Sequence, residues 1–405
     1  MEATTTYDIV LEGGGAKGMV FVGAMQEFLE RGYQTGRLLG TSAGAIAAAL
    51  MAVDYSAAEI EDALSEEIDG TNVINTFMST PGGFSPEEIA QSTTVTYLRE
   101  IDIPLVPEAL EERLNSALVN ALLMHPGYRH LFSFVERGGW YSADNFMSWM
   151  ARKLDSGEYN GAPRAFSGMT LGELFDATGK HLTVIAGDTT AKQMLVLNHI
   201  TAPDLPFIWA VRMSMSIPLL WQEVIWQSAW GTYRGQDITG HAVVDGGVLS
   251  SFPIELFVSD LPHVTAVMGP KESDQILGLL IDEDLDVPGA PPVEQTQNAI
   301  PDVSSIRTLS RMKSLLDTAT QGHDKFVLDG FEHLVARMPA KGYGTTEFDM
   351  SDERRAAIIA AGRTALGAYF DRPLPGMIPL PPAQAAAAQQ ELQRVADRVA
   401  TKILE

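Results

Sequence analysis

The chain of 405 residues contains no cysteine. Disulfide bonds, thiolate metal sites and cysteine nucleophiles are therefore excluded, and the composition fits a reducing compartment. Apolar runs are also short, because none approaches the roughly 18 residues that a membrane-spanning helix requires. The first ten residues, MEATTTYDIV, carry neither the basic nor the apolar region of a secretory signal. We therefore expect a cytoplasmic protein without a transmembrane segment, with non-classical secretion or translocation as the alternative.

Basic residues are scarce, with 28 lysines and arginines against 52 aspartates and glutamates, which gives a net charge of −24. A negative field of this size repels nucleic acids and anionic lipid surfaces. Nucleic-acid binding is therefore not expected. The apolar fraction of 45% is that of an ordinary folded protein, and we interpret the acidic excess as a contribution to solubility.

The N-terminal part alternates between apolar runs and helical patterns. Residues 7–11 and 37–39 have the composition of buried strands, and residues 17–31 and 44–53 that of helices. A strand, a glycine turn and a helix, repeated, are typical of a parallel sheet flanked by helices. The pattern therefore predicts an α/β fold.

Further elements follow along the chain, in one large domain and a tail. The segment at about 66–165 is predicted to be a helical insertion, in which Leu110, Leu114, Leu118 and Leu122 form an apolar stripe that suits either a core-covering helix or a lid. Strands are predicted at 181–186, 193–197 and 242–244, an acidic surface loop at 282–302, and helices at about 304–335 and 352–369. These elements belong to a domain of residues 1–372. A Pro-rich linker and a last helix are predicted within 373–405.

The segment GGGAKG, residues 13–18, has the glycine spacing of a dinucleotide-binding turn. That interpretation requires an acidic residue at the end of the second strand, about 20 residues on, to bind a ribose hydroxyl. Here the second strand runs into GTSAG, residues 40–44, which contains no acid. A P-loop is also excluded, because Met19 and Val20 follow Gly18 where lysine and serine or threonine belong.

GTSAG itself has the G-x-S-x-G pattern of a nucleophile elbow. A sharp turn from strand to helix exposes the side chain of Ser42, and Gly40 and Gly44 remove the Cβ atoms that would collide there. Ser42 then lies at a helix N-terminus, where backbone N–H groups favour developing negative charge. The pattern predicts that Ser42 is a nucleophile.

A serine nucleophile also needs oxyanion donors and a base. Gly13, Gly14 and Gly15 can supply backbone N–H groups at the same edge of the sheet. For the base, Asp245 ends an apolar run and precedes Gly246 and Gly247, so that its carboxylate emerges at a strand end into a tight turn. None of the eight histidines has a recognisable catalytic context, although a histidine-dependent hydrolase, which would require His263, His323 or His333, is the alternative.

With GGGAKG, GTSAG and DGG in this order, the chain resembles the patatin-like phospholipases, over about residues 7–370. The resemblance implies a three-layer α/β fold with a mainly parallel sheet, a lipid acyl hydrolase with a Ser42–Asp245 dyad, oxyanion glycines at 13–15, and no cofactor or metal. Lys17 takes the basic position of the first motif. Residues 213–218 (MSMSIP) and 348–362 also resemble family segments, whereas Ser251 stands where the family usually has asparagine, which suggests a changed turn with activity retained.

The substrate implied by the resemblance is a lipid at a membrane interface, with phospholipase A-type cleavage of fatty-acyl esters. A carboxylesterase or lysophospholipase for neutral or short-chain esters, and a non-catalytic lipid-binding protein, are the alternatives. Lys17 suits either a lipid phosphate or a structural ion pair. Whether the protein forms a homo-oligomer or needs a protein activator is left open by the sequence. Four tryptophans suit either core packing or an acyl-chain slot: Trp209, Trp221, Trp226 and Trp230.

Overall fold

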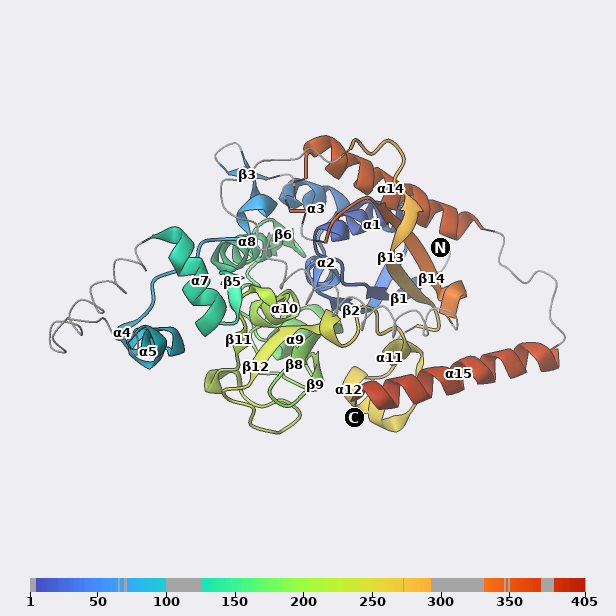
Figure 1. Cartoon of the computed structure of the whole chain (residues 1–405). Helices are drawn as coiled ribbons and strands as arrows, with labels where there is room; N and C mark the ends of the chain where they lie inside the picture. Colours follow the sequence, from blue (N-terminus) through green and yellow to red (C-terminus); the bar gives the residue numbers. More distant parts are fainter. Residues whose placement is uncertain are drawn as a thin grey trace, which may run out of the picture.

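The structure, a computed structural model, is described for most of the chain (Figure 1). The described residues are 5–64, 66–68, 71–99, 125–271, 273–292, 331–345, 347–348, 350–372 and 382–404. The leucine stripe predicted at 110–122 and most of the helix predicted at 304–335 lie outside them.

A mostly parallel sheet forms the centre of the molecule. Within the described residues its strands follow the order β11-β12-β8-β2-β1-β13-β14, and β9 pairs with β8 outside this path. The pairs from β8 through β2, β1 and β13 to β14 are parallel, whereas β9 and β12 run antiparallel to β8. The strand bounds are β1 Thr6–Leu11, β2 Gln34–Thr41, β8 Leu182–Asp188, β9 Gln193–Leu197, β11 Val224–Ile225, β12 Ala242–Asp245, β13 Ile276–Asp286 and β14 Val335–Lys341.

Helices cover both faces of this sheet (Figure 1). The first strand shows why, because Ile9 and Leu11 belong to one apolar cluster and Val10 to the other. The longer helices are α1 Val20–Glu30, α2 Ala43–Ala52, α3 Ala57–Leu64, α7 Pro126–Glu136, α8 Asp144–Leu154, α9 Leu171–Thr178, α10 Phe207–Ser214, α12 Pro262–Met268, α14 Asp352–Asp371 and α15 Pro382–Leu404. The α/β prediction with a C-terminal helix is confirmed.

Shorter elements complete the chain. The short α-helices are α4 Pro86–Gln91, α5 Thr93–Arg99 and α11 Glu255–Val258, and the 3-10 helices are η1 Gly15–Met19, η2 Val73–Thr76, η3 Ser228–Trp230, η4 Gly246–Val248 and η6 Glu332–Leu334. Small two-stranded pairs join β3 Glu67–Ile68 to β4 Thr71–Asn72, β5 Gly139–Tyr141 to β10 Leu219–Trp221, and β6 Glu158–Tyr159 to β7 Ala162–Pro163.

The C-terminal helix α15 packs against the face of the sheet opposite to α1 and α14 (Figure 1). Its buried residues Ala396, Val399 and Ala400 belong to the apolar cluster that contains α11 and α12. The Ser259 hydroxyl donates to the Asp397 carboxylate at 2.6 Å. This helix therefore completes one apolar layer of the fold.

One prediction near the far edge of the sheet is wrong, because residues 282–286, predicted to begin an acidic surface loop, continue β13. The helix predicted at about 304–335 lies mostly outside the described residues. Within them, Glu332–Leu334 form the 3-10 helix η6 and β14 begins at Val335. The last residues of β13 are exposed, so their acidic composition conceals the strand. Pro339 lies in β14, an edge strand, where a missing N–H is tolerated.

Candidate functional site

Ser42 lies between the end of β2 and the start of α2, in a strained conformation with φ 53° and ψ −118°. A non-glycine residue rarely adopts positive φ, and such strain is common at nucleophile turns. The two flanking glycines allow this turn to close. A Cβ atom on Gly40 would overlap the backbone of Gly44, and one on Gly44 would overlap the carbonyl of Leu11.

Asp245 ends β12, which is separated from β2 by β8 alone. The Ser42 side chain lies close enough to the Asp245 carboxylate to act on its pKa, which it lowers as a hydrogen-bond donor would. The N–H of Gly247 also donates to Asp245 Oδ1 at 2.8 Å. The structure therefore brings together the two residues, 203 positions apart in sequence (245 minus 42), that the motifs single out.

Burial dominates the electrostatics of Asp245, which is 4% exposed. Loss of hydration disfavours the carboxylate and raises its pKa to about 7, although hydrogen bonds from Ser42 and Gly247 act in the opposite direction. An aspartate with a pKa near neutrality can both accept and release a proton at physiological pH.

The glycine loop at 13–15 lies directly beside this pair. A Cβ atom on Gly13 would be 3.3 Å from Ser42 Cβ, and Gly15, with φ 55°, lines the same cavity as Ser42. The N–H of Gly13 donates to the Ser251 carbonyl at 3.0 Å. Among the described residues, no acceptor is recorded for the N–H groups of Gly14 and Gly15. These two amides, rather than that of Gly13, are therefore left for a ligand.

Other contacts hold the glycine loop in place. The N–H of Ala16 donates to the Thr345 carbonyl at 2.9 Å, and a Cβ atom on Gly18 would come within 2.5 Å of Ala43 Cβ. Lys17 is buried and forms an ion pair with Glu283 of β13. Lys17 therefore forms a structural ion pair, as one of the two interpretations of this residue expects. Ser251, at the family's asparagine position, anchors the loop through its carbonyl.

Two serines that the motifs did not identify form hydrogen bonds with the backbone N–H groups of Ser42 and Asp245. The Ser214 hydroxyl accepts a hydrogen bond from the Ser42 N–H at 2.9 Å and donates to the Ile185 carbonyl at 2.6 Å. The carbonyl of Ser216 accepts from the Asp245 N–H at 2.9 Å. Both belong to MSMSIP, a segment noted only for its resemblance, and nothing in its composition indicates these contacts.

Histidine takes no part in this arrangement within the described residues, since no hydrogen bond links any histidine to Ser42 or Asp245. His263 contacts Thr401 of α15, and His333 lies in η6 at the edge of the sheet. His323 lies outside the described residues. The part of the chain that is described also contains no group of three or more histidines or carboxylates suited to a metal ion.

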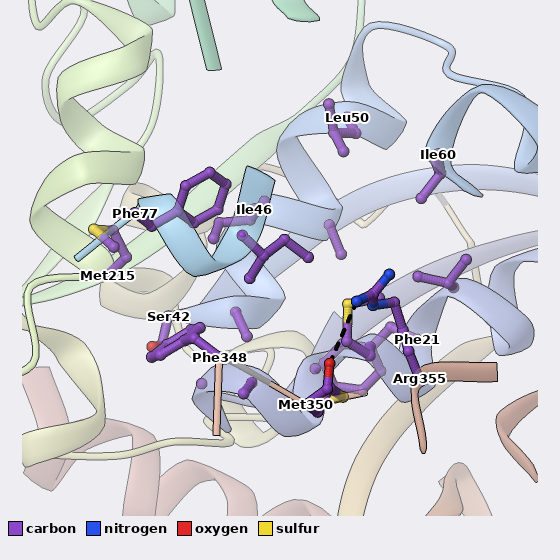
Figure 2. A pocket seen from close by; sticks show the side chains of 18 of the residues that line it. Phe21, Ser42, Ile46, Leu50, Ile60, Phe77, Met215, Phe348, Met350 and Arg355 are labelled. Carbon is purple, nitrogen blue, oxygen red and sulfur yellow. Dashed lines mark hydrogen bonds between the residues drawn. The ribbon is translucent and has the colours of Figure 1, made fainter. Parts of the chain in front are cut away.

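A largely apolar cavity of about 900 Å³, its mouth included, opens beside Ser42 (Figure 2). Trp221 lines it, whereas Trp226 and Trp230 are buried in the core. Its walls come from η1, α1, α2, α3, η2, α8 and the segment that leads into α14, and they include Phe21, Met25, Ile46, Leu50, Ile60, Phe77, Met215 and Phe348. The Ser42 side chain thus lies at the wall of a space suited to a hydrocarbon chain.

A family model described as patatin-like phospholipase matches residues 9–258, more than half of the chain. The chain belongs to this family. Membership in the patatin-like phospholipases indicates lipase or phospholipase activity in general. The match spans GGGAKG, GTSAG and DGG, and ends before residues 348–362, so the resemblance of that last segment stays a prediction.

The uncharacterized protein YqhO of Bacillus subtilis (strain 168) is 27% identical over 365 residues, which are 88% of this chain and 95% of that protein. Two solved structures are more distant. VipD from Legionella pneumophila has a TM-score of 0.43 and 17% identity, over 91% of this chain and 67% of its own. ExoU from Pseudomonas aeruginosa, in complex with SpcU, has a TM-score of 0.38 and 18% identity, over 98% of this chain and 59% of its own. The patatin-like chain described here therefore spans about three fifths of ExoU.

Within the described residues, no helix combines the length and the apolar composition needed to cross a bilayer.

Proposed function

We propose that this chain is a serine lipid acyl hydrolase that cleaves the fatty-acyl esters of phospholipids, in a phospholipase A-type reaction. One observation supports this proposal above the others. The strained Ser42 lies beside the buried Asp245 carboxylate, whose pKa is raised, and it lines an apolar cavity. Family membership gives the general class of reaction.

The reaction proceeds in two halves. Ser42 Oγ attacks the ester carbonyl carbon while its proton passes to the Asp245 carboxylate, and the N–H groups of Gly14 and Gly15 bind the oxyanion. The tetrahedral intermediate collapses, the bond to the alcohol oxygen breaks, and Asp245 returns the proton to that oxygen. Water then attacks the acyl-enzyme, with Asp245 again accepting a proton, and the free acid leaves as Ser42 regains its hydrogen.

The cavity is the proposed binding place of the acyl chain, because its walls are mostly hydrocarbon and sulfur. The head group and the alcohol half of the ester then lie outside it. The net charge of −24 favours zwitterionic or neutral lipid surfaces over anionic ones.

The test uses a fluorescent phospholipid, labelled on one acyl chain at a time, and a short-chain nitrophenyl ester. Both are offered to the wild type and to Ser42→Ala and Asp245→Ala. We expect both variants to lose at least about a thousandfold in kcat/KM, because nucleophile and base act as a unit. Activity on the short ester alone would support a general carboxylesterase, and binding of lipid without hydrolysis would support a non-catalytic protein.

His263→Ala and His333→Ala are the matched controls for the base. They should retain wild-type rates, since neither residue contacts the Ser42–Asp245 pair. Full activity in Ser42→Ala would refute the proposal.

A further inference from the structure

One charged side chain stands out in the wall of the cavity. Arg355 of α14 lines it together with Phe21, Met25 and Met350, and its side chain is 10% exposed. In Figure 2, Ser42 and Phe348 lie on one side of the cavity and Arg355 on the other, with its guanidinium nitrogens directed toward the middle of the lining side chains. A permanent charge in such surroundings is costly unless it is paired.

The pairing of Arg355 within the described residues is incomplete. Its Nη1 lies 3.0 Å from Asp352, which is itself 76% exposed and therefore strongly hydrated. Its Nη2 donates to the Met350 carbonyl at 3.4 Å, a long hydrogen bond (Figure 2). A guanidinium has more N–H donors than these two contacts use, and no further acceptor for them is recorded among the described residues.

The position of Arg355 in its helix adds a second argument. Ser351 caps α14, and Arg355 lies in the first turn, where the helix dipole opposes a positive charge. Its neighbour Arg354, in the same turn, is well paired, with two hydrogen bonds to Glu347 and two to backbone carbonyls. Within the described part of the chain, Arg355 has only the polar contacts with Asp352 and Met350. Stabilisation of the helix therefore does not explain why an arginine stands at this position.

We propose that Arg355 is a specificity residue that binds an oxygen acceptor, a carboxylate or a hydroxyl, at the far end of the substrate's acyl chain. The proposal rests on the proposed hydrolysis at Ser42. With the ester carbonyl at Ser42 and the chain passing Ile46 and Leu50, a polar chain terminus meets the guanidinium at the other side of the cavity. The preferred substrates are then esters of oxidised fatty acids, such as ω-carboxy or ω-hydroxy acids, in place of plain saturated ones.

A charge-assisted hydrogen bond formed among largely apolar side chains is stronger than one formed in water. A plain methyl terminus, in contrast, leaves the guanidinium desolvated and without an acceptor. The preference therefore arises from both a gain with the polar chain and a loss with the apolar chain.

The test compares nitrophenyl esters of ω-carboxy fatty acids with plain fatty-acid esters of matched length, over a series of chain lengths. Wild type, Arg355→Met, Arg355→Lys and Asp352→Asn are measured. At the length that spans the cavity, we expect Arg355→Met to lower the ratio of kcat/KM for ω-carboxy over plain ester by about tenfold or more. Arg355→Lys should retain part of the preference, and Asp352→Asn, which removes the competing carboxylate, should increase it.

Arg363→Met is the matched control, because Arg363 lies on the same helix and pairs with Glu30 at the surface, away from the cavity. It should leave the ratio unchanged. A melting temperature measured for each variant separates loss of fold from loss of preference.

A ratio within about twofold of the wild type in folded Arg355→Met would overturn the inference. So would a defect confined to phospholipids, since that result would mean that the guanidinium binds the head-group phosphate. Failure of the proposed function looks different, because then the wild type hydrolyses neither kind of ester.

Discussion

In the proposed mechanism, Asp245 has to be ionised before it can accept the Ser42 proton, and its surroundings oppose ionisation. Because burial raises its pKa to about 7, only part of the protein carries the ionised carboxylate at neutral pH. We expect kcat/KM to rise with pH along an acid limb centred near 7. The measurement is a pH profile on a short-chain ester, with the product quantified by chromatography so that the signal does not depend on pH.

A limb centred near the ordinary aspartate value of 3.8 would contradict this expectation. His241, which pairs with Asp188 at 2.8 Å, provides the control for a histidine titration. His241→Gln should leave the limb in place.

The same raised pKa has a consequence for stability. Asp245 binds its proton more tightly in the folded chain than in the unfolded one, so its contribution to stability is complete below about pH 4 and is lost as the pH rises through 7. Asp245→Asn removes this loss. The variant should be inactive and yet, at pH 8, more stable than the wild type by up to about 4 kcal/mol.

Denaturant unfolding at pH 8 and at pH 4 measures the difference. The gain should shrink toward zero at the lower pH, where the wild-type carboxyl is protonated in both states. A variant that is equally stabilised, or destabilised, at both values would show that the charge is not responsible.

Ser214 accepts a hydrogen bond from the strained backbone of Ser42, and it is not one of the residues that line the cavity. Ser214→Ala leaves the Ser42 N–H and the Ile185 carbonyl without their shared partner. We expect kcat to fall about 5- to 100-fold with little change in KM, since a lost buried hydrogen bond costs about 1–3 kcal/mol. Ser259→Ala, which removes a buried hydroxyl that contacts α15, should change stability and leave kcat as it is. Equal kcat values in the two variants would show that Ser214 does not help to position Ser42.

Helices α1 and α14 approach each other so closely that glycine is required on both. A Cβ atom on Gly23 would overlap the Ile359 carbonyl, and one on Gly362 would overlap that of Val20. We expect Gly23→Ala to destabilise the protein by about 1–3 kcal/mol, because backbone has to move. It should also lower activity, since α1 and α14 carry Phe21 and Arg355 of the cavity.

Gly168→Ala is the control, because a Cβ atom there meets nothing within 4 Å. Both variants are compared by denaturant unfolding and by ester hydrolysis. A Gly23→Ala protein as stable as the Gly168→Ala protein would mean that the helices can separate without cost.

These elements also show where sequence reasoning works. Ser42 and Asp245 could be singled out as candidates because each lies in a turn whose glycines are needed locally, next to a strand of recognisable composition. Ser214 could not, since it meets Ser42 only after folding, across a separation of 172 residues. Likewise, β13 and β14 were missed because exposed acids and a proline conceal strands whose pairing depends on a distant partner.

The charge of the whole molecule bears on which lipid surface it can use. At −24, the protein is repelled by anionic vesicles over distances that salt controls, with a Debye length of about 30 Å at 0.01 M and about 8 Å at 0.15 M. We expect hydrolysis of a reporter phospholipid to be faster in zwitterionic than in anionic vesicles at low salt. Added salt should narrow the difference by accelerating the anionic case.

A water-soluble short-chain ester, neutral in charge, is the control, because its approach to Ser42 does not depend on the long-range field. Its rate should be independent of salt over the same range. If the rate on anionic vesicles is instead highest at low salt, then a local basic surface dominates the encounter, and the overall charge is not what selects the lipid. If salt leaves both vesicle rates unchanged, entry of the acyl chain into the cavity, and not approach to the surface, limits the reaction.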